Sequence, residues 1–240
     1  MNASELNERL QNVYQRYLEK TYALEWPEGV SAPLLMHVFE EYTTVPCKIL
    51  VVGQETHRWG QMSTKPGVPE LQSNYARFCL GKAANYGEGR KPRCLTSPFW
   101  NFSRALFYNF NNQANGITRK TNGFLWTNIS KFDAHATTPS QELQEKNRAG
   151  FELLKTEIEI VRPDVVVFLT GTKYNHWLDE LFNCERRAIL DNNYLSQLVG
   201  ITLADKPLMF QTMHPRTLVM NKRYHDVLTH LQSSCKELQP

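Results

Sequence analysis

Short apolar runs recur along the chain and are separated by stretches with helical periodicity. Residues 48–52 (KILVV), 124–127 (FLWT), 164–170 (DVVVFLT) and 208–211 (LMFQ) have the length and apolar character of buried strands. Strands that alternate with helices favour a parallel sheet that is covered on both faces. The pattern therefore predicts an α/β fold built on a central four-stranded parallel sheet with helices on both faces.

Three helices are predicted from spacing and from their start signals. Residues 3–22 carry apolar side chains three and four positions apart, which indicates an amphipathic N-terminal packing helix. A serine followed by proline at 97–98 predicts a second helix start. Residues 138–141 have the order of a capping box with proline at the first helical position, and we expect this third helix to reach about Val161.

Residues 61–93 do not fit the alternation of strands and helices. They are rich in Gly, Pro, Lys, Arg and Asn, and contain a few aromatic residues. Such a segment is typical of a long functional loop or of a partly helical insertion. No linker, repeat or low-complexity tract divides the chain, so we expect a single domain over residues 1–240 with its core at about 46–235.

Composition narrows the class of protein only slightly. The chain has 240 residues of which 41% are hydrophobic, enough to bury one large core. A membrane-spanning helix needs roughly 20 consecutive apolar residues, and no segment approaches that length. The N-terminus is polar rather than signal-like, so we expect a cytoplasmic protein that does not bind membranes. A net charge of +3 mildly favours contact with a polyanion.

The cysteines give no sign of a disulfide framework or of a bound metal. All five are widely spread, their number is odd, and no CxxC pair occurs. This pattern argues against a zinc ribbon or a clustered iron–sulfur site. We therefore expect no bound metal, and we also expect no cofactor and a monomeric state.

Polar residues follow each predicted strand directly. They occupy positions 53–57, 127–128, 171–172 and 213–218. Ligands of such sheets bind beyond the carboxyl ends of the parallel strands. We therefore expect Gln54, Glu55, Asn128 and His214 to lie around one crevice.

These strand ends carry motifs that resemble those of the uracil-DNA glycosylase superfamily. That family has Gly-Gln-Asp-Pro-Tyr after one strand and His-Pro-Ser-Pro-Leu after another, and this chain has GQETH at 53–57 and HPRTL at 214–218. FLWTN, which ends at Asn128, and FLTGT, which ends at Thr172, match the two strands between them. The four matches occur in the family's order and span about Lys48 to Leu218, so the chain is identified as a divergent member.

The resemblance implies two catalytic residues. Glu55 stands where the family places an aspartate that activates water, and a carboxylate can orient water and face a cationic sugar. Its extra methylene moves the carboxylate by roughly an ångström. His214 stands where the family places a histidine that donates to the developing oxyanion of the departing base.

The same resemblance implies that Gln54, His57 and Asn128 bind the base. An asparagine offers a donor and an acceptor, so Asn128 can read two adjacent positions of a pyrimidine edge. His57 stands where uracil-specific members have a tyrosine that excludes 5-substituents, and Thr56 replaces the proline before it. Strict uracil specificity is therefore not expected. Three aromatic residues are open candidates for stacking on the base: Trp59, Tyr75 and Phe78.

The last motif is expected to contact DNA. Leu218 aligns with an apolar wedge that the family inserts into the duplex, and Arg216 and Thr217 beside it are expected to contact phosphates. A further basic patch is expected from Lys82, Arg90, Lys91 and Arg93.

The sequence thus favours a metal-independent DNA glycosylase that flips a damaged or modified pyrimidine out of DNA and hydrolyses its glycosidic bond. The base is uracil or a bulkier 5-modified cytosine, such as the hydroxymethylated and glucosylated cytosines of phage DNA, in repair or in anti-phage defence. Two alternatives stay open. One is a catalytically inactive protein that binds DNA or a nucleotide on the same fold, and the other is a hydrolase acting on a different ligand.

Overall fold

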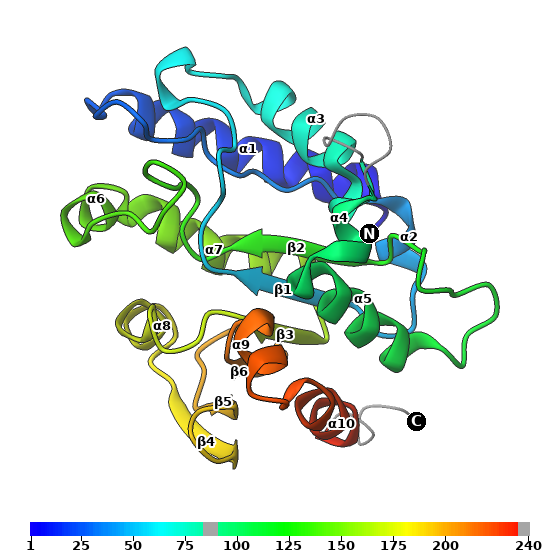
Figure 1. The fold of residues 1–240 in the computed structure, drawn as a ribbon. Coiled ribbons are helices and arrows are strands. Elements are labelled where there is room, and N and C mark those ends of the chain that lie inside the picture. Colours follow the sequence, from blue (N-terminus) through cyan, green and yellow to red (C-terminus); the bar gives the residue numbers. More distant parts are fainter. Residues whose placement is uncertain (84–90, 235–240) are drawn as a thin grey trace.

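The computed structural model describes residues 1–83 and 91–234. Within them the chain forms one six-stranded sheet with the order β2-β1-β3-β6-β5-β4 (Figure 1). The strands are β1 Ile49–Gly53, β2 Phe124–Asn128, β3 Val165–Phe168, β4 Glu185–Leu190, β5 Leu195–Val199 and β6 Leu208–Thr212. The α/β fold class predicted from the sequence is confirmed.

The four strands that the sequence predicts form the parallel part of the sheet. β1 pairs with β2 and β3, and β3 pairs with β6, all in parallel. β5 and β4 extend this core as an antiparallel edge, so the prediction of a four-stranded sheet was incomplete. β4 has the sequence ERRAIL and is largely exposed, and such a charged edge strand lacks the apolar run of a buried one.

The helices are α1 Ala3–Tyr22, α2 Glu40–Thr44, α3 Val68–Phe78, α4 Arg93–Thr96, α5 Pro98–Asn111, α6 Gln141–Lys146, α7 Arg148–Val161, α8 Asn175–Phe182, α9 Pro215–Met220 and α10 Tyr224–Ser234. Two short 3-10 helices are η1 Met62–Thr64 and η2 Cys79–Gly81. The limits of α1 and the start of α5 agree with the sequence prediction.

Helices cover both faces of the sheet, and two adjacent residues of β2 show this. Successive side chains of a strand point to opposite faces. Thr127 donates a hydrogen bond to Glu157 of α7, whereas the ring of Trp126 lies 5.0 Å from that of Trp100 in α5. α1 packs on α7, and α9 and α10 pack on α5 (Figure 1).

The predicted helix from residue 138 to Val161 is in fact two helices. Ser140, not Thr138, is the N-cap of α6, and its hydroxyl accepts from the Leu143 amide at 3.3 Å. Asn147 separates α6 from α7, and its Oδ1 accepts the Tyr17 hydroxyl of α1 at 3.0 Å. This tertiary hydrogen bond is absent from the local sequence pattern, which explains the error.

The segment 61–93 is mostly helical where it is described, because η1, α3, η2 and the start of α4 lie in it. The partly helical alternative is therefore the correct one. Arg90, predicted as part of a basic patch, and Cys235 lie outside the described residues. The other four cysteines, Cys47, Cys79, Cys94 and Cys184, are free thiols. Among residues 1–83 and 91–234, no helix is both long and apolar enough to cross a membrane.

Candidate active site

The predicted strand-end residues lie around one pocket. Gln54, Glu55, His57, Asn128 and His214 all line a cavity of about 580 Å³, at the edge where the parallel strands β1, β2 and β6 end. The crevice expected from the sequence is therefore present. A cavity of this size is within the usual range of small-ligand sites.

The two strand-end loops from β1 and β2 hold each other in register. The amide of Ile129 donates to the carbonyl of Gly53, and the amide of Ser130 donates to that of Gln54. A Cβ on Gly53 would lie 2.3 Å from Asn128 Oδ1, so only glycine allows the asparagine side chain to sit against β1.

A buried aspartate ties down the loop that carries Glu55 and His57. The Thr56 hydroxyl donates to Asp133 Oδ2 at 2.7 Å, and the Arg58 amide donates to the same oxygen at 2.9 Å. Asp133 Oδ1 accepts the Ala136 amide. Thr56, which replaces the proline of the family motif, therefore fixes this loop by hydrogen bonding.

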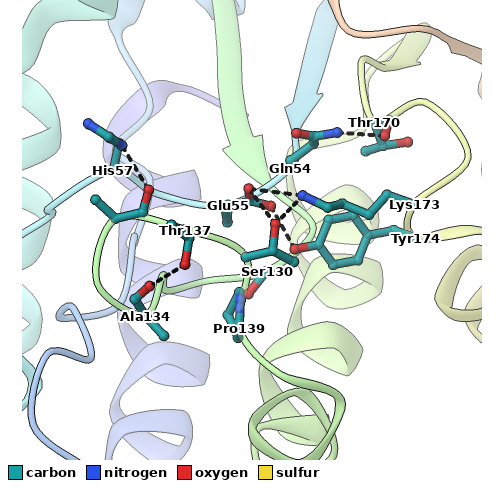
Figure 2. A network of polar contacts seen from close by, with 12 residues as sticks. Gln54, Glu55, His57, Ser130, Ala134, Thr137, Pro139, Thr170, Lys173 and Tyr174 are labelled. Atoms are coloured by element: carbon teal, nitrogen blue, oxygen red, sulfur yellow. Dashed lines mark hydrogen bonds and ion pairs between the residues drawn. The ribbon is translucent and has the colours of Figure 1, made fainter.

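Three donors converge on the Glu55 carboxylate (Figure 2). Tyr174 donates to Oε2 at 2.7 Å, Thr138 donates to Oε1 at 2.9 Å, and Lys173 Nζ lies 3.5 Å from Oε1. Burial and the Glu55 charge raise the pKa of Tyr174, which keeps its phenol protonated as a donor. Figure 2 shows Glu55 directed toward Lys173 and Tyr174 and away from His57. Oε1 already accepts from two donors, whereas Oε2 accepts from Tyr174 alone and can take one further hydrogen bond, for example from water.

His214 presents a defined hydrogen-bond donor to the pocket. Its Nδ1 accepts from the backbone amide of Arg216 at 3.2 Å as the N-cap of α9. Burial lowers the pKa of His214, and the nearby Glu55 charge acts in the opposite direction. The ring is therefore neutral at pH 7, and because Nδ1 is an acceptor, the proton is on Nε2.

Asn128 has a hydrogen bond at one end of its amide and none at the other. Its Oδ1 accepts from Trp126 Nε1 at 3.3 Å. Its Nδ2 is buried and has no partner among the described residues. The pocket wall therefore contains a donor that lacks a partner in the protein.

Gln54 and His57 line the cavity, but their side chains hydrogen-bond to backbone carbonyl groups of the protein. Gln54 Nε2 donates to the Thr170 carbonyl at 2.9 Å, which fastens the β1 loop to the end of β3. His57 is exposed at the rim, and its Nδ1 lies 3.2 Å from the Ala136 carbonyl.

Aromatic residues form the remaining wall, and the structure separates the three candidates for stacking. Trp59 and Phe78 line the cavity. Tyr75 does not, because it is buried and its hydroxyl donates to the Trp126 carbonyl. Sequence analysis missed Phe99. Its ring stacks on that of His214, with 6.2 Å between the ring centroids and 23° between the ring planes. Its position directly after the Ser97-Pro98 helix start was the available signal.

The predicted DNA-contact residues lie on α9, with one correction. Arg216 is exposed and Thr217 is partly exposed. Leu218 is 0% exposed and belongs to the hydrophobic core, because α9 packs against α5 and α10. It cannot present a wedge from this position. The exposed apolar side chains of α9 are Val219 and Met220, at 51% and 74%.

Only part of the predicted basic patch lies at the pocket. Arg93 lines the cavity. Lys82 donates to the Lys120 carbonyl away from it, and burial lowers its pKa. Lys91 is exposed.

Comparison with known proteins agrees with the motifs and the geometry. The model of the Uracil DNA glycosylase superfamily matches residues 42–238, a range that includes all four strand-end motifs. No curated protein matches the chain. The chain therefore belongs to the uracil DNA glycosylase superfamily, and this membership supports a DNA glycosylase function in general.

Proposed function

We propose that this protein takes a damaged or modified pyrimidine out of DNA and hydrolyses its N-glycosidic bond, leaving an abasic site. The observation that carries the proposal is the arrangement of Glu55, Asn128 and His214 around one cavity of about 580 Å³. A carboxylate, an amide and a neutral histidine are the groups needed to place water, read a base edge and stabilise a departing anion.

The reaction divides between Glu55 and His214. Glu55 orients a water molecule, accepts its proton as the oxygen bonds to C1′, and stabilises positive charge on the sugar. The C1′–N bond breaks, and its electron pair leaves with the base. His214 Nε2–H donates to the oxygen of this anion. The base then takes up the proton that the water released.

The position of His57 at the rim is consistent with a base that carries a 5-substituent. His57 is exposed and bonded to the Ala136 carbonyl, so it does not fill the cavity as a tyrosine in the family motif is expected to do. Uracil and 5-modified cytosines both stay in the proposal, with roles in repair or in anti-phage defence.

The DNA-facing surface is proposed to include α9. Arg216 and Thr217 contact phosphates, and Met220 with Val219 supplies the apolar wedge in place of the buried Leu218. This assignment rests on the exposure of Val219 and Met220. Met220→Ala should weaken excision from duplex DNA more than from single strands, because only the duplex must be unstacked. Equal losses on both substrates would remove Met220 from base extrusion.

The direct test is an abasic-site assay on DNA that contains uracil, hydroxymethylcytosine or glucosylated cytosine. The unmodified protein should cleave at least one substrate. Glu55→Gln should abolish most of that activity, whereas Glu142→Gln, an exposed glutamate of α6, should leave it unchanged.

One observation favours a second candidate, an inactive DNA-binding protein. The Glu55 carboxylate already accepts from Tyr174, Thr138 and Lys173, so a water has only one lone pair of Oε2 left to bind. Firm DNA binding without cleavage of any substrate would favour this second candidate.

A further inference from the structure

Two residues of β2 form a hydrogen bond that fixes the orientation of the base-reading amide. Trp126 and Asn128 are two positions apart, so their side chains lie on the same face of the sheet. Trp126 Nε1 lies 3.3 Å from Asn128 Oδ1. An indole N–H can only donate, so it must face the amide oxygen and not the amide nitrogen.

The opposite end of this amide is a donor without a partner. Asn128 is 2% exposed, and its buried Nδ2 makes no hydrogen bond to any described residue. A buried donor without an acceptor destabilises the protein. Such a group at the wall of a cavity is accounted for if a ligand supplies the acceptor.

The indole that holds the amide is itself immobilised. The Tyr75 hydroxyl donates to the Trp126 carbonyl at 2.8 Å and accepts from its amide at 3.0 Å. The Tyr75 ring stacks on the indole, with 5.7 Å between the ring centroids and 17° between the ring planes. Trp100 and Trp59 pack edge-on against it at 5.0 and 5.8 Å. Rotation of Trp126 away from Asn128 would disturb all of these contacts.

We propose that Trp126 is a positioning residue that makes the pocket select a 4-oxo pyrimidine over its 4-amino counterpart. The inference rests on the proposed function and chooses among the bases left open there. A 4-oxo base offers an acceptor at C4 and a donor at N3, which match Nδ2–H and the second lone pair of Oδ1. A 4-amino base offers a donor at C4 and an acceptor at N3, so both contacts become repulsive unless the amide flips.

The test uses pairs of bases that differ only at position 4. These are uracil with cytosine, and 5-hydroxymethyluracil with 5-hydroxymethylcytosine, each in the same DNA strand. The ratio of kcat/KM within each pair measures the selection. The unmodified protein should favour the 4-oxo member by at least about 100-fold, because a mismatched polar contact in a fixed site is strongly rejected.

Trp126→Phe keeps an aromatic ring and removes the N–H, so the amide becomes free to flip. The ratio should fall by at least about 10-fold, through both a loss on the 4-oxo base and a gain on the 4-amino base. Trp100→Phe is the matched control, since Trp100 lines the same cavity and packs on Trp126 without a hydrogen bond to Asn128. It should leave the ratio unchanged. Equal loss on both members of a pair in Trp126→Phe would overturn the proposal.

A binding measurement keeps the test independent of folding in the variant and of catalysis. Strands that carry 2′-fluoro forms of the four nucleosides, in which the glycosidic bond resists cleavage, are titrated with the unmodified protein. Tighter binding of the 4-oxo members is the expected result, and equal or tighter binding of the 4-amino members overturns the inference. The same titration is repeated with Trp126→Phe, in which the preference for the 4-oxo members should shrink. If both results hold and nothing is cleaved in the natural series, the glycosylase proposal fails while the role of Trp126 stands.

Discussion

Two glutamates in this protein accept hydrogen bonds from the same three residue types, and they lie in very different places. Glu55 accepts from Tyr174, Thr138 and Lys173 at the pocket. Glu157 accepts from Tyr14, Thr127 and Lys131 between α1, β2 and α7.

The difference between the two networks is exposure. The side chains of Glu157 and Lys131 are both 0% exposed, whereas those of Glu55 and Lys173 are 14% and 43% exposed. Inside the core the donors offset the cost of burying a charge. At the pocket the same donors hold a carboxylate that stays partly exposed, and this exposure is what the proposed catalytic role of Glu55 requires. The set of donors alone does not distinguish a structural glutamate from a catalytic one.

The largest effect is expected in the core. Glu157→Gln should lower the free energy of unfolding by about 3–5 kcal/mol, because it leaves Lys131 charged, buried and unpaired. Urea denaturation measures the change. Adding Lys131→Met to the variant should recover part of the loss. A loss below about 1 kcal/mol would mean that the two networks are not different in kind.

The corresponding change at the pocket should affect catalysis rather than stability. Glu55→Gln should reduce abasic-site formation by at least about 100-fold, and lower the free energy of unfolding by only about 1 kcal/mol, since glutamine still accepts one hydrogen bond. DNA binding should persist because it depends mainly on phosphate contacts. Single-turnover cleavage, denaturation and binding are measured together on one preparation. Unchanged cleavage would refute the role of Glu55.

Tyr14 and Tyr174, which donate to Glu157 and Glu55, allow the core and pocket networks to be compared through smaller changes. A hydrogen bond to a charged group contributes about 1.5–3 kcal/mol. Tyr14→Phe should therefore lose about that much stability with normal cleavage in the remaining folded protein. Tyr174→Phe should lower kcat by roughly 10-fold with little change in KM, because it loosens the Glu55 carboxylate. The prediction fails if both variants show the same ratio of lost activity to lost stability.

The smallest expected effect is on the pKa of His214, which is influenced by the charge of Glu55 but not by that of Glu157. Glu55 raises the pKa of His214 against the lowering by burial, so Glu55→Gln should lower that pKa further, while Glu157→Gln should leave it unchanged. Because the folded pKa lies below the ordinary value of 6.5, the unfolded chain binds more protons at acidic pH. Stability from this group is thus complete above pH 6.5 and declines as pH falls below it. An NMR titration of the imidazole checks both statements.

The sequence was sufficient to predict the parallel core and the meeting of Gln54, Glu55, Asn128 and His214, because strand-end residues of a parallel sheet share one edge. It was not sufficient for β4, whose charged residues carry no strand pattern. It was also wrong for Leu218, where a motif alignment gives a residue type but not whether the helix turns that residue toward the core.

Residues that complete the site through tertiary contacts were missed for a related reason. Tyr174, Lys173 and Thr138 reach Glu55 from segments more than 80 positions away, and no local pattern encodes such a meeting. The catalytic and DNA-contact roles, the domain limits and the monomeric state stay predictions.

The central position of β1 has a consequence for the protein during its synthesis. Both neighbours of β1 in the sheet, β2 and β3, come much later in the chain. At a translation rate of roughly 5–20 residues per second, the apolar run Ile49–Gly53 emerges several seconds before either partner exists. A nascent chain that ends before residue 124 therefore exposes an unpaired, uncharged β-branched segment, which is the kind of segment that aggregates or recruits chaperones. Ribosome-bound chains stalled before and after β3 should differ sharply in chaperone crosslinking at β1, and equal crosslinking in both would show that β1 is shielded by other means.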